Sequence, residues 1–313
     1  MKRNAEIGLF TKPSGLNDMK ILITGSEGQL GWELLRQAGS FNIEAVGLDL
    51  PYLDITAESG IVKVFKEYKP DILINAAAYT NVDKAETDEK ACFAVNVNGP
   101  ENLAEACKNI NIPMIHISTD YVFDGTKKTP YKENDTVSPT GIYGKSKADG
   151  ENRVKNILEK HIILRTSWLY GVHGHNFVKT MLKLGKEKEV IGVVSDQFGS
   201  PTSAADLSEA ILIIVSRILN NCEVTFGTYN YCGEGITSWH GFAEKIIETA
   251  KQYSPVTTKL VKPISTGEYP VKARRPAFSA LDCSLIQEKF GITPKPWQKS
   301  LEAVIGRIFS CKN

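Results

Sequence analysis

The chain has 313 residues, 42% hydrophobic and 23% charged, which is ordinary for a globular protein that buries a large core. Lys and Arg total 37 and Asp and Glu total 36, so the formal net charge of +1 favours neither nucleic acid nor an anionic membrane as partner. No apolar run reaches the ~20 residues of a membrane span, and six cysteines without metal-ligand spacing favour a reducing compartment, the cytoplasm, and no metal site.

The chain begins with a short segment that differs from the rest. Residues 1–18 are mixed and polar, without the apolar run of a signal peptide, and we expect a poorly ordered extension there. From Met19 onward, short apolar runs alternate with helical segments. The runs that predict strands are Lys20–Thr24, Ala45–Asp49, Asp71–Asn75, Met114–Ser118 and His161–Arg165. The helical segments between them are Gly28–Gln37, Ile61–Tyr68 and Phe93–Asn109.

This alternation predicts the fold class. Strands that are apolar throughout are buried on both faces, as in a parallel sheet. When such strands alternate with helices, right-handed βαβ units build a doubly wound sheet. We therefore predict an α/β protein with a Rossmann-like domain over residues 19–170.

The second half of the chain is less regular. The pattern predicts helices over Phe177–Lys186, Ala204–Leu219 and Trp239–Tyr253, a strand over Phe226–Tyr231, and a proline-containing, loop-rich stretch over Ser254–Phe278. We expect residues 171–313 to form a smaller α/β part that binds substrate, because loops carry function more often than cores do. We expect the chain to return to the Rossmann domain around residues 203–232.

A glycine-rich loop follows the first strand and opens the first helix. Gly25, Gly28 and Gly31 are spaced G-x-x-G-x-x-G. Glycines in such a loop make the tight turn, let the backbone approach a pyrophosphate, and let the helix pack on the strand. The helix N-terminus adds unpaired N–H groups for the anion. A plain turn is the alternative, but the order strand, loop, helix favours a dinucleotide site.

Two acidic residues after the second strand bear on the choice of dinucleotide. Asp49 stands where an acid binds the adenosine ribose 2′-OH, although a turn-forming Asp before Pro51 fits equally well. Asp54, followed by Ile55, is a candidate for the adenine edge. Because the loop after Gly25 holds no Lys or Arg for a 2′-phosphate, the sequence favours NADH over NADPH.

Tyr143 and Lys147 form a Y-x-x-x-K element. On a helix these side chains share a face, and a cation beside a phenol lowers its pKa from about 10 towards the range useful for acid–base chemistry. The element alone is common by chance on solvated helices. Here it follows Thr119, at the carboxyl end of the fourth strand, where ligands bind such sheets and where a hydroxyl can bond a substrate carbonyl.

Small residues close the third strand. Ala76, Ala77 and Ala78 would let the backbone and a cofactor come close, although packing alone could also explain them.

Together these segments resemble a known family, the dTDP-4-dehydrorhamnose reductases, which are extended short-chain dehydrogenases/reductases. The resemblance extends from Met19 to near Trp297. The segments that carry it include Gly25–Gly31, Asn75–Ala78, Ser118–Phe123, Tyr143–Lys147, Arg165–Gly171, Asn176–Met181 and Arg275-Pro276.

The resemblance implies an activity and a set of site residues. The enzyme would reduce the C4 ketone of dTDP-4-dehydro-L-rhamnose to dTDP-L-rhamnose with hydride from NADH or NADPH. Tyr143 would donate the proton, Lys147 would tune Tyr143 and hold the ribose, and Thr119 would polarise the carbonyl. The residues that would line the cofactor are Gln29, Leu30, Asp49, Asp54, Ile55, Ala78, Tyr79 and Thr80. Asp120 and Trp168 would contact the sugar nucleotide. Asn176 and Arg275 would bind its diphosphate; the alternative is that they make only loop and cap hydrogen bonds.

The resemblance also bears on assembly. Some family members dimerise through a Mg²⁺ held by acidic residues, and Glu33 matches one of them. Gln298 stands where a further acid is expected, so a metal-linked dimer is not predicted and a homodimer is left open.

Two other functions compete with this one. A nucleotide-sugar epimerase on the same fold would transfer hydride without net cofactor consumption; a dehydratase would add an acid pair beside Thr119, but Asp120 is followed by Tyr121. A non-catalytic subunit resembling the regulatory subunit of methionine adenosyltransferase would keep the fold and lose the acid–base pair. Thr119, Tyr143 and Lys147 are all present, which favours an enzyme.

Overall fold

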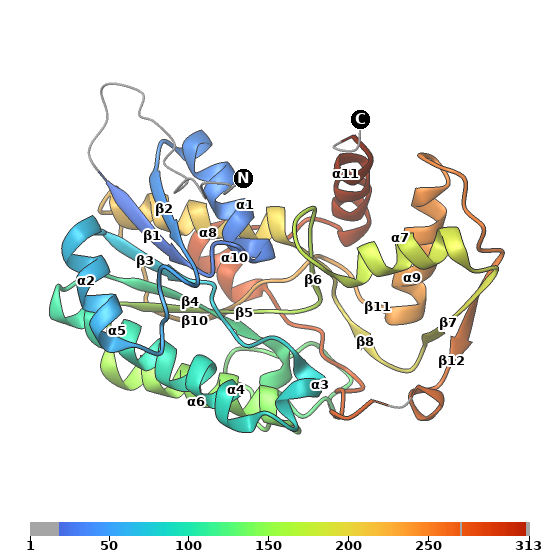
Figure 1. Cartoon of the computed structure of the whole chain (residues 1–313), viewed down its shortest axis with the longest axis horizontal. Helices are drawn as coiled ribbons and strands as arrows, with labels where there is room; N and C mark the ends of the chain where they lie inside the picture. The colour runs from blue at the N-terminus through green and yellow to red at the C-terminus, as the bar shows by residue number, and fades with distance from the viewer. Residues whose placement is uncertain (1–18, 270, 311–313) are drawn as a thin grey trace, which may run out of the picture.

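The computed structural model describes residues 19–269 and 271–310, so the extension expected over residues 1–18 lies outside the described residues. A six-stranded parallel sheet, in the order β10-β5-β4-β3-β1-β2, forms its centre (Figure 1). Its strands are β1 (Lys20–Thr24), β2 (Glu44–Leu48), β3 (Ile72–Asn75), β4 (Met114–Thr119), β5 (His161–Thr166) and β10 (Gly227–Asn230). The predicted α/β, Rossmann-like fold is therefore confirmed.

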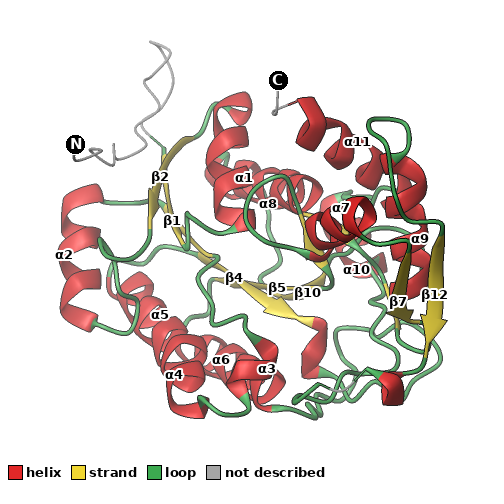
Figure 2. Cartoon of the chain, turned by 45° about the vertical axis from the view of Figure 1, so that its right-hand side comes forward, coloured by secondary structure: helices red, strands yellow, loops and turns green. Residues whose placement is uncertain are grey.

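Helices cover both faces of the sheet, as Figure 2 shows. Ile21 and Ile23 of β1 pack towards one set of helices, and Leu22 packs towards the other. This alternation explains why the strands are apolar along their whole length. The first set is α1 (Gln29–Ala38), α8 (Ala204–Leu219) and α10 (Ser284–Phe290), and the second is α2 (Glu58–Tyr68), α5 (Gly99–Asn109) and α6 (Ile142–Ile157).

The helix predicted over Phe93–Asn109 is interrupted. It consists of α4 (Glu89–Phe93), a π-helical turn over Ala94–Asn98, and then α5. The π turn presses against α6, since a Cβ on Gly150 would lie 2.1 Å from the Asn96 carbonyl oxygen. Such turns often occur at functional sites. A short helix, α3 (Val82–Ala85), precedes α4.

A second hydrophobic cluster lies to the right of the sheet in Figure 1. It is formed by α7 (Phe177–Glu187), α9 (Trp239–Ala250), α11 (Trp297–Ser310) and the parallel pair of β7 (Val190–Val194) and β12 (Leu260–Ile264). The loop-rich prediction for Ser254–Phe278 was wrong at β12, because that strand is stabilised by a partner far away in sequence. The remaining strands are two-residue pairs, β6 (Leu169–Tyr170) with β9 (Thr202–Ser203) and β8 (Phe198–Gly199) with β11 (Thr237–Ser238).

Candidate active site

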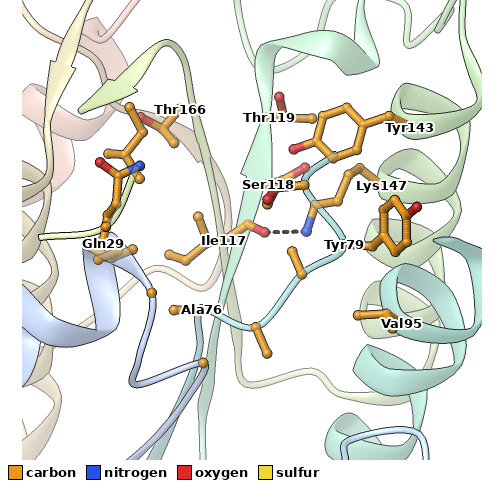
Figure 3. Close-up of a pocket in the computed structure, with 18 of the residues that line it drawn as sticks. Gln29, Ala76, Tyr79, Val95, Ile117, Ser118, Thr119, Tyr143, Lys147 and Thr166 are labelled. Atoms are coloured by element: carbon orange, nitrogen blue, oxygen red, sulfur yellow. Dashed lines mark hydrogen bonds between the residues drawn. The ribbon is translucent and has the colours of Figure 1, made fainter. Parts of the chain in front are cut away.

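A cavity of about 740 Å³ opens at the carboxyl ends of the central strands. Its wall comes from the glycine loop, the segment after β3, the end of β4, the start of α6 and residues 166–176, part of which Figure 3 shows. The predicted residues that line it are Gly25, Gly28, Gln29, Leu30, Asp49, Asp54, Ile55, Ala76, Ala77, Ala78, Tyr79, Thr80, Thr119, Asp120, Tyr143, Lys147, Trp168 and Asn176. Gly31 and Arg275 are the predicted residues absent from the lining.

Backbone approach explains the glycines of the loop. Gly25 has a φ of +72°, and a Cβ there would lie 2.5 Å from the Ala77 nitrogen. A Cβ on Gly31 would lie 2.3 Å from the Gly25 carbonyl oxygen, so Gly31 acts in packing and not in lining the cavity. Gly28 precedes α1 without a side-chain cap, which leaves N–H groups at the helix start for an anion.

Asp49 and Asp54, which follow β2, accept hydrogen bonds from nearby backbone N–H groups and also line the cavity. Asp49 accepts hydrogen bonds from the backbone N–H groups of Glu27 (3.0 Å) and Leu50 (2.8 Å). It therefore ties the glycine loop to the end of β2. Asp54 accepts from the backbone and hydroxyl of Thr56 at 2.9 and 2.8 Å.

The π turn positions the segment after β3. Asn96 accepts a hydrogen bond from the Tyr79 backbone N–H at 2.9 Å and donates to the Tyr79 carbonyl oxygen at 3.1 Å. It also donates to the Ser146 hydroxyl of α6 at 3.0 Å. The buried Asn96 amide thus fixes the segment after β3 relative to α6, the helix that carries Tyr143 and Lys147.

Tyr143 lies beside Thr119, at the carboxyl end of β4 (Figure 3). Burial raises the pKa of the Tyr143 phenol above its ordinary value, and a hydrogen bond with Thr119 opposes that rise. The Tyr121 ring meets the Tyr143 ring edge-on, with centroids 5.5 Å apart and an interplanar angle of 75°. The expectation that Lys147 lowers the pKa of this phenol was therefore wrong, because burial has the larger effect and raises it. The phenol is held in its protonated form, as a proton donor requires.

Lys147 follows one turn later on α6 and is 2% exposed. Its Nζ donates to the Ile117 carbonyl oxygen at 2.6 Å, the dashed line in Figure 3. Burial lowers the pKa of Lys147 to about 8, against the opposing effects of Glu151 and Cys92. The Lys147 amine therefore loses its proton more readily than an exposed lysine does.

Asp120 follows Thr119 and is buried. Its Oδ1 accepts a hydrogen bond from the Thr119 hydroxyl at 3.0 Å. Burial raises the pKa of Asp120 to about 6, with hydrogen bonds from Ser279 and Thr119 acting against the rise. Asp120 therefore binds a proton more readily than an exposed carboxyl does.

Trp168 and Asn176 form the opposite side of the cavity. Trp168 has a φ of +48° and stacks on Trp239, with ring centroids 3.6 Å apart. Asn176 caps α7 by accepting from the Lys179 N–H at 3.0 Å, and it donates to Gln29 Oε1 at 2.9 Å. The cap that was the alternative to diphosphate binding is present, and the same amide joins this side of the cavity to the start of α1.

Two residues named from the resemblance are engaged elsewhere. Arg275 forms a double ion pair with Asp83, at 2.9 and 2.6 Å, and does not line the cavity. Glu33 is buried between Arg36 (2.7 Å) and Arg307 (2.9 Å), so its charge is already balanced within the chain. Among residues 19–269 and 271–310, no cluster of three or more His, Cys, Asp or Glu could hold a metal ion.

Several cavity residues were not predicted. Ile117, Ser118 and Thr166 lie at strand ends, and the rule that ligands bind there could have identified them. Ser167 lies in the Arg165–Gly171 segment that carries the family resemblance, which could have identified it, whereas His175 carried no signal in the sequence.

The protein combines a Rossmann-like sheet, a glycine loop packed closely against the segment after β3, and Thr, Tyr and Lys side chains around one cavity. These features define its class as the extended short-chain dehydrogenases/reductases.

Comparison with known proteins identifies the family. The family described as "RmlD substrate binding domain" matches residues 19–309. A dTDP-4-dehydrorhamnose reductase of Aggregatibacter actinomycetemcomitans is 43% identical over 91% of this chain and 98% of its own. A crystal structure of a dTDP-4-dehydrorhamnose reductase from Clostridium acetobutylicum has a TM-score of 0.86 at 41% identity, covering 93% of this chain and 99% of that one. The Bacillus anthracis enzyme, solved in complex with NADP, has a TM-score of 0.85 at 38% identity, covering 93% and 100%. The chain belongs to the dTDP-4-dehydrorhamnose reductase family.

No helix among the described residues is long and apolar enough to cross a membrane.

Proposed function

We propose that this protein reduces the C4 ketone of dTDP-4-dehydro-L-rhamnose to dTDP-L-rhamnose with NAD(P)H, in nucleotide-sugar synthesis for polysaccharides. The observation that carries the proposal is the convergence of Thr119, Tyr143 and Lys147 on one cavity beside the glycine loop. Relatives that share 35–43% of their sequence with the chain have this activity in their names.

The cofactor side of the cavity fits a dinucleotide. Gly25 lets the glycine loop pack closely against Ala77, Gly28 lines the cavity, and the uncapped start of α1 supplies N–H donors where a pyrophosphate would approach. Asp49 and Asp54 would face the adenosine, and Ala76 to Thr80 the remaining length of the cofactor. When bound, the dihydronicotinamide supplies a hydride to the carbonyl carbon of the sugar.

Side chains of the protein would polarise the ketone of the sugar and donate a proton to its oxygen. The Thr119 hydroxyl, which donates to Asp120 Oδ1 in the free protein, would turn its single proton to the ketone oxygen. Tyr143 would transfer its phenolic proton to that oxygen as the alkoxide forms. The raised pKa of Tyr143 keeps this proton in place until the reaction needs it. Lys147 would hold the cofactor ribose and stabilise the phenolate left behind.

The sugar nucleotide would lie between the sheet and residues 171–313. Asp120 and Trp168 would contact the sugar. Asn176 would donate to the diphosphate by giving up one of the two hydrogen bonds that its amide makes to Gln29 and Gly171. We propose residues 19–170 as the cofactor domain, with β10 returning to its sheet, and residues 171–313 as the substrate part. Arg275 is a weaker candidate for the diphosphate, since its ion pair with Asp83 would first have to open.

We further propose that the protein works in the cytoplasm, where nucleotide sugars and NAD(P)H occur together, either alone or as a homodimer without a bridging Mg²⁺. Among the two nicotinamide cofactors, Asp49 favours NADH, because a carboxylate beside the ribose bonds a 2′-OH and repels a 2′-phosphate.

The test is an assay with dTDP-4-dehydro-L-rhamnose and each cofactor, with product analysis. We expect one NAD(P)H consumed for each dTDP-L-rhamnose formed. An epimerase would convert the sugar without net loss of the nicotinamide absorbance. A regulatory subunit would be silent in this assay and would co-purify with a partner synthetase; either result would overturn the proposal.

A further inference from the structure

A buried chain of polar side chains lies behind Lys147. It leads from Thr24, at the end of β1, through Asn75, at the end of β3, to His116 in β4. Asn75 and His116 are fully buried and lie opposite each other in the pairing of β3 with β4. The chain ends at Lys147, whose Nζ is 3.5 Å from His116 Nε2. No part of the reaction proposed above makes use of His116.

The hydrogen bonds determine the orientation of the Asn75 amide. One atom of this amide, Oδ1, lies 3.1 Å from the Ala77 backbone nitrogen and 2.7 Å from the Thr24 hydroxyl. A backbone N–H can only donate, so the atom that faces it must be the carbonyl oxygen. The amide nitrogen of Asn75 therefore faces His116 Nδ1, at 3.1 Å, and donates to it. It follows that Nδ1 is an acceptor and carries no proton.

The proton of the neutral ring must then be on the other nitrogen. Burial, together with the nearby Lys147, keeps the pKa of His116 well below its ordinary value, so the ring carries a single proton. With Nδ1 accepting, that proton lies on Nε2, which faces Lys147. An N–H that points at an ammonium brings two donors together, whereas an N–H that points at a neutral amine donates to its lone pair.

We propose that His116 is a positioning residue: held as the Nε2–H tautomer by Asn75, it disfavours the ammonium form of Lys147 and makes Lys147 a readier proton donor. The use of this proton rests on the proposed function. After Tyr143 gives its proton to the sugar oxygen, a buried phenolate remains. Lys147, one turn further on the same helix face, transfers a proton from Nζ to the phenolate oxygen and then regains one from water.

Two acidic groups near Lys147 favour its ammonium form. Glu151, one turn further on α6, and Cys92, on α4, both raise the pKa of Lys147. The effect of Glu151 is reduced by Arg165, which holds both of its carboxylate oxygens at 2.8 and 2.7 Å. Burial acts in the opposite direction, and the N–H of His116 acts in the same direction as burial.

The first test is the tautomer of His116 in the unmodified protein, measured by ¹⁵N NMR of histidine-labelled chain. His161 provides an internal contrast, because its Nδ1 lies 2.6 Å from the Leu158 carbonyl oxygen and must donate to it. We expect His116 as the Nε2–H tautomer and His161 as the Nδ1–H tautomer, with the resonances of both rings assigned through their scalar connection to the assigned backbone. A proton on His116 Nδ1 at neutral pH would overturn the proposal, and this measurement needs no stable variant.

The second test is the pKa of Lys147, measured by ¹³C NMR of lysine-labelled protein and assigned with Lys147→Arg. In His116→Leu we expect this pKa to rise by roughly one unit, the effect of one hydrogen bond. A role in packing alone predicts no rise, since an apolar side chain leaves Lys147 at least as well buried. The matched control, His161→Leu, should leave the pKa of Lys147 unchanged.

The pH dependence of kcat/KM provides a further comparison. In His116→Leu the alkaline limb of the profile should shift to higher pH, following the pKa of Lys147. In His161→Leu it should stay at the same pH. A fall or no change in the pKa of Lys147 in His116→Leu would contradict the proposal. Both NMR measurements use protein without substrate, so failure of the proposed reductase activity would be seen separately.

Discussion

The two sides of the cavity are built in different ways. On the cofactor side, Gly25, Ala77 and Thr119 lie at or just beyond the carboxyl ends of neighbouring parallel strands, so the backbone of the sheet places them. On the other side, Trp168 has a left-handed backbone conformation, and its ring stacks on Trp239 from a distant helix. Backbone positions tolerate little change, whereas packed side chains can adjust. We therefore expect substitutions to act abruptly on the first side and gradually on the second.

The largest effect is expected at Tyr143, where the two sides meet. Tyr143→Phe should lower turnover by roughly 10²–10⁴-fold, because the proton donor is lost while the ring keeps its packing. Cofactor affinity, measured by titration of NADH fluorescence, should change little. Tyr121→Phe is the matched control, since its ring packs against Tyr143, and it should keep most of the turnover. Wild-type turnover in Tyr143→Phe would remove Tyr143 from the mechanism.

The next effect tests the cofactor side alone. Gly25→Ala places a Cβ 2.5 Å from the Ala77 nitrogen at a φ of +72°, so the loop must shift. We expect the cofactor Kd to rise by roughly 100-fold, from strain and lost backbone contacts. Gly39→Ala, at the end of α1 with nothing within 4 Å of the new Cβ, should bind cofactor like the wild type. Equal Kd values in the two variants would show that the close approach at Gly25 is unimportant.

Asp120 provides a pH test at the junction of the two sides, where Ser279 from the C-terminal part reaches it. The pKa of this carboxyl is about 6 in the folded protein and near 3.8 when it is unperturbed. Between these values the folded state binds more protons, so the free energy of unfolding should fall as pH rises from 4 to 6, by about 2–3 kcal/mol.

Asp120→Asn should lack this part of the pH dependence. Urea unfolding of both proteins at several pH values measures the difference. The same slope in the two proteins would contradict the assignment.

The smallest effect is expected on the substrate side. Trp239→Leu removes the ring that supports Trp168, and an aromatic pair contributes about 0.5–1.5 kcal/mol. We expect the KM for the sugar nucleotide to rise roughly threefold to tenfold, with kcat and cofactor affinity nearly unchanged. Trp32→Leu, which removes a stack on His173 outside the cavity, should leave the KM unaltered. A loss of cofactor affinity in Trp239→Leu would contradict the separation of the two sides.

The sequence predicted the side of the cavity that depends on local pattern. Apolar runs identified β1, β3 and β4, and the spacing of Gly25, Gly28 and Gly31 identified the loop between β1 and α1. These signals lie within a few residues of one another. The Y-x-x-x-K element indicated a catalytic site only because it follows β4 in the chain.

The rest depends on contacts between distant segments. β12 was missed because its partner β7 is far away in the chain, and the π turn was missed because its cause is the close packing of Gly150 against Asn96. His116 carried no signal, since a single histidine in an apolar strand gains a role only once Asn75 and Lys147 are placed beside it.

Hydride transfer to C4 of the sugar is tested most directly with NADH that carries deuterium on the transferring face of the nicotinamide, mixed with dTDP-4-dehydro-L-rhamnose. The product should be dTDP-L-rhamnose with one deuterium at C4 for each cofactor oxidised. Product without deuterium at C4, or sugar converted while the cofactor remains reduced, would contradict a reductase in which Thr119, Tyr143 and Lys147 act on that carbonyl.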